Sequence, residues 1–167
     1  EDVTVAFHEP LPSRVRYEVA ALPGVLQAEP FRVVAARLRF EHARRRVPLF
    51  GRLADGELRR VLGADLHPVA PPRDGVILTG KLADILGFAP GDVLRVEVLE
   101  AERPVREVAV AGRVDELLGL NAYMEAGALH RLMREQGSWS GAFLRVDAAA
   151  APVLNAELKR MPAVAGA

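Results

Sequence analysis

The chain has 167 residues with a formal net charge of zero, and half of its residues are apolar. This length supports one sizeable core or two small ones, and the balanced charge gives no overall field to recruit nucleic acid or anionic lipid. The absence of cysteine excludes disulfides, thiol catalysis and cysteine-bound metal. No apolar run approaches the ~18 residues of a membrane helix, and there is neither a signal peptide nor an initial Met. We expect a soluble piece excised from a longer protein.

A strand, a helix and a second strand are predicted at the N-terminal end. Residues 3–7 alternate between apolar and polar or small side chains, which is typical of a strand. Residues 15–22 then carry apolar side chains at helical spacing, and Pro23-Gly24 ends the helix. The next extended segment begins at Val25. This order indicates a β-α-β unit.

The same unit recurs at the C-terminal end. EVAALPGV, residues 18–25, and ELKRMPAV, residues 157–164, both fit E-x-x-x-[LM]-P-[GA]-V at an offset of 139 residues. A strand-like run at residues 143–146 precedes the second copy as residues 3–7 precede the first. Internal repetition is an informative signal in a single sequence. We therefore expect residues 1–40 and 139–167 to form one subdomain of two paired β-α-β units.

Residues 41–138 have a different pattern of apolar and polar residues, which favours an inserted β-rich subdomain with short helices. Residues 34–40 alternate apolar with largely basic side chains, and EHARRR turns the chain into a returning strand. Residues 94–98 and 108–114 alternate in the same way and predict an antiparallel pair, while residues 128–133 carry a helical stripe. The fold class expected for the whole chain is α+β.

DGVILTGKL, residues 74–82, matches the opening of a phosphate-binding loop, G-x-x-x-x-G-K, but lacks its other requirements. Leu82 stands where a Ser or Thr would bind magnesium. The stiff, apolar VIL lies where the backbone should curl around phosphate, so the strand falls inside the motif. We expect a strand, a helix capped by Thr79, a solvent-facing Lys81 and no bound nucleotide.

Other catalytic and metal-binding motifs fail as well. GSWSG, residues 137–141, has Trp139 at the centre, where a nucleophile elbow needs Ser. The four histidines have no metal-binding spacing, and each is expected in a surface or turn position: His8, His42, His67 and His130. We predict that the chain is not an enzyme and holds no cofactor or metal.

Two stretches are candidates for binding a partner or cargo. The basic cluster at the expected hairpin tip could contact a lipid headgroup or an acidic partner. In LLGLNAYM, residues 117–124, apolar side chains crowd around two helix-breaking residues, and burial is favoured over display to a partner. The candidate residues are Arg44, Arg45, Arg46, Phe50, Leu118, Leu120, Tyr123 and Met124.

The whole pattern resembles the extracytoplasmic domain of FtsX/MacB/LolC-type ABC transporter permeases. The resemblance covers nearly the whole chain and is carried by the L-P-G-V end units and two middle segments, GVILTGKLADILGFAPGDVLRVEV (75–98) and VAGRVDELLGLNAYMEAGALHRLM (110–133). In that family the domain lies between the first two membrane spans of a permease half and faces the periplasm or cell exterior. One departure is that the second end unit stops at Ala167, before a full return strand.

The resemblance implies a non-catalytic domain that transmits conformational change and binds cargo or a partner protein. The implied partners are a cytoplasmic ABC ATPase subunit, a second permease half as homo- or heterodimer, and a periplasmic protein, lipid, lipoprotein or peptide. The full-length protein would lie in the inner membrane. Two alternatives stay open. One is a cytosolic β-barrel regulatory module that binds nucleic acid or a small ligand through LGFAPGDV, residues 86–93. The other is an α+β enzyme such as a hydrolase, with a site drawn from His8, Asp115, Glu116 and Ser140.

Overall fold

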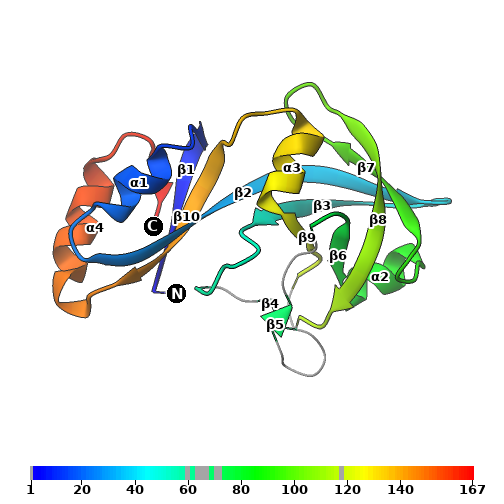
Figure 1. Cartoon of the computed structure of the whole chain (residues 1–167), viewed down its shortest axis with the longest axis horizontal. Helices are drawn as coiled ribbons and strands as arrows, with labels where there is room; N and C mark the ends of the chain where they lie inside the picture. The colour runs from blue at the N-terminus through cyan, green and yellow to red at the C-terminus, as the bar shows by residue number, and fades with distance from the viewer. Residues whose placement is uncertain (1, 59–60, 63–67, 70–72, 117–118) are drawn as a thin grey trace. The chain divides into compact units, whose positions relative to one another are not determined.

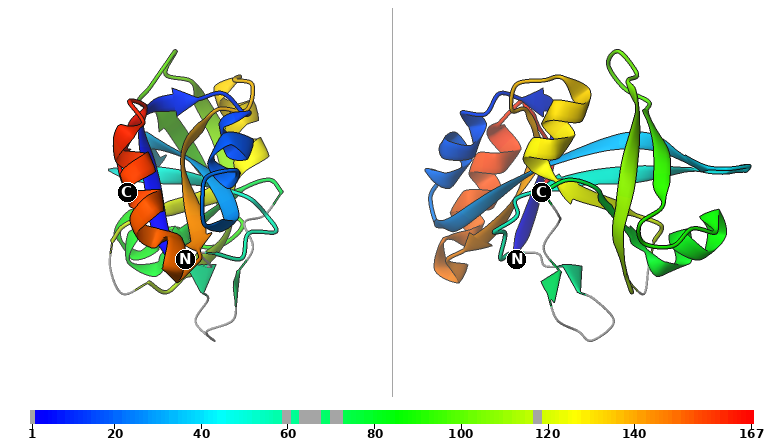
Figure 2. Two further views of the ribbon diagram at one scale, coloured as in Figure 1. Left: turned by 90° about the vertical axis from the view of Figure 1, so that its left-hand side faces the viewer. Right: turned by 45° about the vertical axis from the view of Figure 1, so that its right-hand side comes forward.

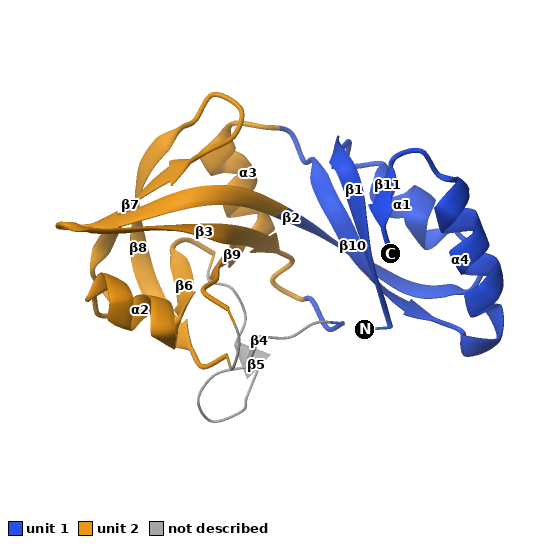
Figure 3. Cartoon of the chain, turned by 180° about the vertical axis from the view of Figure 1, so that it is seen from behind, with its two compact units in different colours: residues 1–32, 56–59, 136–167 blue, residues 33–55, 60–135 orange. Residues whose placement is uncertain are grey.

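The computed structural model describes residues 2–58, 61–62, 68–69, 73–116 and 119–167. The chain divides into two compact units, shown in Figure 3. Unit 1 comprises Glu1–Arg32, Gly56–Arg59 and Gln136–Ala167, and unit 2 comprises Val33–Asp55 and Arg60–Glu135. The expected mixture of helices and strands is confirmed.

The long strand β2 (Val25–Phe40) belongs to both units, so the unit boundary does not fall at the expected residue 40. Residues 25–31 of β2 pair with a strand of unit 1, and residues 36–39 pair with a strand of unit 2. Four successive apolar residues, 33–36, follow the change of partner at residues 32–33, and nothing in this run marks the change.

Unit 1 contains a four-stranded antiparallel sheet with α1 (Val15–Ala20) and α4 (Ala151–Arg160) on one face (Figures 1 and 2). A 3-10 turn (Ala148–Ala150) precedes α4. The strand order is β11-β1-β10-β2. This order, with the chain sequence β-α-β-β-α-β, is the ferredoxin-like arrangement. Besides β2, the strands of this sheet are β1 (Val3–Leu11), β10 (Trp139–Val146) and β11 (Val164–Gly166).

The two copies of the repeated motif occupy equivalent places in unit 1. After α1 the backbone N–H of Val25 donates to the carbonyl of Leu22, and after α4 the N–H of Val164 donates to the carbonyl of Met161. Each copy therefore makes the same turn from helix into strand. The apolar side chains at the expected helical spacing are buried in both copies: Val15 and Val19, Leu154 and Leu158.

The strands of unit 2 form a closed six-stranded barrel, a more definite form than the β-rich module that the sequence predicts. The order β2-β3-β9-β6-β8-β7 is closed by pairing between β7 and β2. Its other strands are β3 (Ala43–Arg52), β6 (Val76–Thr79), β7 (Val93–Val98), β8 (Val105–Val114) and β9 (Ala122–Glu125). A separate two-stranded sheet joins β4 (Val61–Leu62) and β5 (Pro68–Val69).

The barrel and two helices, α2 (Gly80–Leu86) and α3 (Ala126–Met133), share one apolar core. Buried side chains alternate with exposed or half-buried ones along β7, β8 and residues 34–40 of β2, as their sequences predict. Gly87 ends α2 at φ 76°, a left-handed conformation that glycine adopts without strain. Fully buried side chains at the centre include Leu38, Leu49, Leu78, Leu82, Leu94 and Leu129.

The segment that mimics a phosphate-binding loop is a buried strand followed by α2. All four residues of β6 are buried and Lys81 is exposed, as expected. Thr79 stands at the N-cap position of α2, but its side chain does not cap the helix. Its hydroxyl instead accepts a hydrogen bond from the backbone N–H of Asn121 at 3.2 Å, which joins α2 to the start of β9. Among the described residues, no helix is long and apolar enough to cross a membrane.

Replacing Glu125 by alanine is expected to lower the free energy of unfolding by about 1 kcal/mol. The Glu125 carboxylate caps α3, because it accepts hydrogen bonds from the backbone N–H groups of Gly127 at 3.0 Å and Ala128 at 2.9 Å. Urea denaturation followed by circular dichroism measures the loss. Glu102→Ala is the control, since Glu102 is an exposed turn residue. Equal stability of the two variants would contradict the role of this cap.

Candidate partner-binding surfaces

The arginines expected at a hairpin tip lie within β3 instead, because the turn from β2 needs only residues 41–42 and β3 begins at Ala43. Glu41 adopts the left-handed conformation of the turn, with φ 54°. Arg44–Arg46 are all exposed. Successive side chains of a strand alternate between its faces, and Val47 is buried in the barrel core. The first and third arginines therefore lie on the outer face of the barrel.

Phe50 and Tyr123 stack on each other outside the main core, on the paired strands β3 and β9. Their ring centroids are 5.6 Å apart with an interplanar angle of 24°. Ile77 and Val114 complete this small cluster, with Tyr123 9% exposed and Phe50 partly buried. Tyr123 is thus a packing residue here, and Phe50 keeps one side available to solvent.

A polar network lies beside this aromatic pair. The Tyr123 hydroxyl donates to Glu116 at 2.5 Å, and the Asn121 amide donates to the other carboxylate oxygen of Glu116 at 3.2 Å. Burial raises the pKa of Tyr123 above its ordinary value of 10.0, and the hydrogen bond to Glu116 raises it further. Tyr123 is therefore a neutral donor at physiological pH, and both oxygens of Glu116 are occupied.

The remaining candidates from residues 117–124 are divided between core and surface. Met124 is 3% exposed and belongs to the barrel core, and Leu120 is partly buried against that core. Burial, which the sequence favours for this stretch, is thus confirmed for Met124 and Tyr123. Leu118 lies outside the described residues. Binding by the accessible candidates, the three arginines together with Phe50 and Leu120, stays a prediction.

The residues of the enzyme alternative are engaged elsewhere or isolated. Ser140 accepts a hydrogen bond from the Arg32 guanidinium at 3.1 Å, and Glu116 is held by the network above. His8 is exposed on β1 of unit 1, and Asp115 is exposed in unit 2. The arrangement contains no nucleophile with its general base among these four side chains, all of which the structure describes.

One histidine differs from expectation. His130 on α3 is 9% exposed, with Nε2 3.8 Å from a carboxylate oxygen of Glu135, so it is a buried residue and not a surface one. It is one of the buried residues of α3, whereas His42 is exposed as expected. His67 lies outside the described residues. Within the described part of the chain, no three His, Asp or Glu side chains are grouped so that they could hold a metal.

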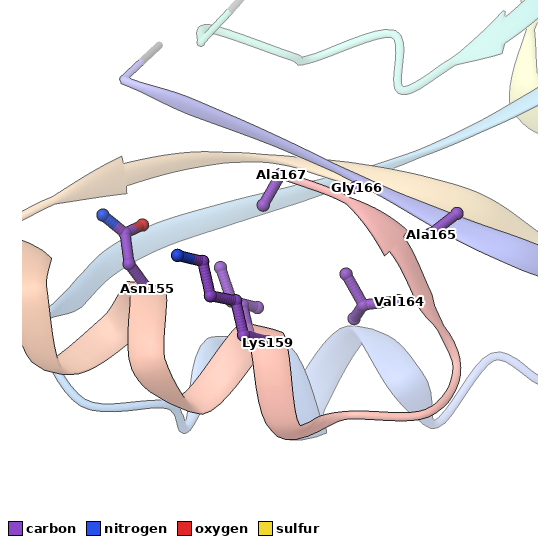
Figure 4. Close-up of a pocket in the computed structure, with 7 residues that line it drawn as sticks. Asn155, Lys159, Val164, Ala165, Gly166 and Ala167 are labelled. Atoms are coloured by element: carbon purple, nitrogen blue, oxygen red, sulfur yellow. The ribbon is translucent and has the colours of Figure 1, made fainter.

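A hollow of about 480 Å³ opens in unit 1 between α4 and β11 (Figure 4). Asn155, Leu158 and Lys159 line it from the helix, and residues 164–167 line it from the strand side. Lys159 supplies its charged group, and Val164 and the alanines supply small apolar contacts. These lining residues include no acid–base pair of side chains.

Two charged residues on β2 are buried, which the sequence does not predict. Glu29 is 6% exposed and Arg32 is 4% exposed. The Glu29 carboxylate accepts hydrogen bonds from the backbone N–H groups of Glu57 at 2.6 Å and Leu58 at 3.1 Å, and from the side chain of Gln27 at 3.2 Å. It thereby ties a distant segment to unit 1. Nothing local distinguishes these two charges from the other charged residues of β2, Arg37 and Arg39.

Replacing Tyr123 by phenylalanine is expected to lower the free energy of unfolding by about 1 kcal/mol near neutral pH, because Glu116 loses a hydrogen-bond donor. The pKa of Tyr123 is raised in the folded state. Its contribution is therefore fully present below the unfolded pKa and is lost as pH rises above it. Urea denaturation of both proteins from neutral pH to above about 10 should show the difference shrinking with pH. A constant difference would contradict the hydrogen bond.

No protein-family model matches the chain, and no curated protein matches it either. Among solved structures, the chain is similar to the extracellular domain of the noncanonic ABC-type transporter YknZ from Gram-positive bacteria, with a TM-score of 0.63 and 15% identity, covering 99% of this chain and 98% of that one. It is also similar to the periplasmic region of MacB from Actinobacillus actinomycetemcomitans, with a TM-score of 0.62 and 13% identity, covering 93% and 81%. The chain therefore has the fold of these extracytoplasmic transporter domains, as its sequence resemblance predicts.

Proposed function

We propose that the chain is the extracytoplasmic domain of an ABC transporter permease, which transmits conformational change and binds cargo or a partner protein without catalysing a reaction. The observation that carries the proposal is the similarity to the YknZ domain over 99% of the chain. This similarity extends through both the ferredoxin-like unit and the barrel, which is a more demanding match than either unit alone.

The architecture suits a mechanical role. The first part of strand β2 belongs to the sheet of unit 1, and its second part belongs to the barrel of unit 2. One continuous strand therefore connects the two units and is hydrogen-bonded within each. Both ends of the chain belong to unit 1. In the proposed permease, movement of the flanking membrane spans would therefore enter through unit 1 and reach unit 2 through β2. The partners in this proposal are an ABC ATPase subunit and a second permease half.

Cell fractionation with protease protection tests the proposal. An antibody against this chain is expected to detect a membrane-bound protein in the native host, much heavier than 18.1 kDa. Protease added outside the inner membrane should cut the detected segment, while a cytoplasmic marker protein stays intact. A soluble band near the mass of the chain that the added protease does not cut would contradict the proposal and favour the regulatory or enzymatic alternatives.

A further inference from the structure

Three arginines cross the outer face of the barrel near the turn between β2 and β3. Arg39 in β2 is directly paired with Arg95 in β7. Arg44 in β3 lies opposite Arg39, because the two-residue turn at 41–42 sets Phe40 against Ala43. All three arginines are exposed, and their inward neighbours Leu38 and Val96 are fully buried. Arg39, Arg44 and Arg95 are called the arginine row below.

The arginine row places like charges opposite each other, and the cross-strand partner of Arg95 on its other side is Glu107 in β8. Across the described residues, none of its three side chains has an ion pair or hydrogen bond. The neighbouring cross-strand pair is matched in charge, since Arg37 lies 3.0 Å from Glu97. Like charges directly opposite each other destabilise a sheet. The Arg39–Arg95 pair is therefore unfavourable in the sheet, with Glu107 flanking it on one side only, and a function in binding would account for the pair.

The arginine row borders an open hollow of about 340 Å³. Arg39 and Arg95 line the hollow together with three apolar residues, Phe40, Val93 and Leu94. Val93 is 51% exposed, so an apolar contact lies beside the guanidinium groups. Two carboxylates, those of Glu41 and Glu107, also line the hollow. The positive charge is thus confined to a short row, with acidic groups at its border.

We propose that the arginine row binds the carboxylates of an acidic segment of a partner protein. The proposal rests on the proposed function and specifies the chemistry of its partner. A guanidinium group holds a carboxylate through two parallel hydrogen bonds. The Cβ atoms of directly opposed residues are about 5 Å apart, so Arg39 and Arg95 can hold one carboxylate together or two on the same segment.

The bordering carboxylates favour a protein segment over a membrane. An anionic lipid surface presents negative charge over a whole plane and would meet Glu41 and Glu107 as well as the arginines. An acidic segment can place its carboxylates at the arginine row alone and set apolar side chains against Val93. Its binding would replace the repulsion between Arg39 and Arg95 by attraction to the ligand.

Binding of fluorescein-labelled hexaglutamate to the 167-residue chain at an ionic strength of about 0.1 M, where exposed charges more than about 10 Å apart are largely screened, tests this proposal. The double variant Arg39→Glu/Arg95→Glu is expected to bind the peptide at least about tenfold more weakly than the wild type. The control Arg14→Glu/Arg160→Glu changes the net charge equally at exposed positions of unit 1. It should bind within about twofold of the wild type, because distant surface charges are screened.

Three outcomes would overturn the proposal: no binding by the wild type, equal weakening in the control, or arginine-dependent binding to phosphatidylglycerol vesicles without binding to the peptide. The vesicle result would assign the arginine row to a membrane surface. Circular dichroism checks the fold of each variant. If the double glutamate variant does not fold, Arg39→Gln/Arg95→Gln carries the same expected loss. Protease protection of the native protein is an independent measurement, so failure here leaves the proposed function standing.

Discussion

Replacing Gly141 by alanine is expected to lower the free energy of unfolding by about 3 kcal/mol or more. Gly141 lies in β10 and is paired with Ala6 in β1 and Phe31 in β2. A Cβ atom at this position would lie 2.2 Å from the carbonyl oxygen of Val5 and 2.6 Å from Cζ of Phe31. The carbonyl belongs to a paired strand, and the ring is stacked on Phe143 with centroids 4.6 Å apart. Neither can move without disturbing the sheet of unit 1.

Urea denaturation followed by tryptophan fluorescence measures this effect in unit 1, because the single tryptophan of the chain, Trp139, begins β10. Circular dichroism on the same samples reports both units together. Gly112→Ala in β8 is the matched control, since a Cβ atom there would meet nothing within 4 Å. Its stability should change by less than about 0.5 kcal/mol. Equal stability of both variants would contradict the close approach at Gly141.

The repeated β-α-β unit is the part of the fold that the sequence predicts in most detail. Its two copies can be recognised by comparing the sequence with itself, without knowing which strands pair. The offset of 139 residues carries Thr4 onto Phe143, and the structure pairs these two residues with each other across β1 and β10. The flanking pairs exchange under the same offset: Val3 with Leu144, and Val5 with Ala142. An internal two-fold relation therefore passes through the Thr4–Phe143 pair.

Backbone hydrogen bonds follow the same relation. The N–H of His8 donates to the carbonyl of Ala163 at 3.0 Å, and the N–H of Asp147 donates to the carbonyl of Gly24 at 2.8 Å. The offset converts one bond into the other. In both bonds, a residue in or just after the first strand of one copy donates to the residue just before the second strand of the other copy. A three-residue β11 is sufficient for this contact, so the return strand that the sequence leaves in doubt is present.

Closure of the barrel could not be predicted, because alternation says which face of a strand is buried and not which strand lies beside it. Residues 36–39 of β2 pair with residues 95–98 of β7, far along the chain. The parallel pairs β3–β9 and β6–β8 are likewise joined by segments that contain other elements. The arginine row depends on the first of these pairings. The sequence predicts a basic face on residues 34–40 but cannot place Arg95 beside Arg39.

Glu29 shows the same limit at a buried charge. Its backbone partners, Glu57 and Leu58, follow it by 28 and 29 residues. No spacing rule connects a strand residue to a loop at that distance. A charged residue in a strand is by default expected on an exposed face. Only the folded arrangement shows that both oxygens of this carboxylate meet backbone donors.

Replacing Glu29 by alanine is therefore expected to lower the free energy of unfolding by about 3 kcal/mol, because two backbone hydrogen bonds to a buried charged group are lost. Both carboxylate oxygens lie 3.1 Å from the N–H of Leu58, and one lies 2.6 Å from the N–H of Glu57. Urea denaturation followed by Trp139 fluorescence measures the loss in unit 1. Hydrogen exchange at Glu57 and Leu58 should accelerate in the variant.

A glutamine at position 29 distinguishes the role of the charge from that of the acceptor. Glu29→Gln keeps one acceptor oxygen for the backbone N–H groups but sets an amide donor near them, so we expect a loss of about 1–2 kcal/mol, smaller than for alanine. Glu18→Ala on the exposed face of α1 is the control for loss of a carboxylate. If Glu29→Ala unfolds at the same urea concentration as the control, the carboxylate does not hold residues 56–58 in unit 1. If only the two Glu29 variants lose stability, and the alanine variant loses more than the glutamine variant, this buried carboxylate holds residues 56–58 in unit 1.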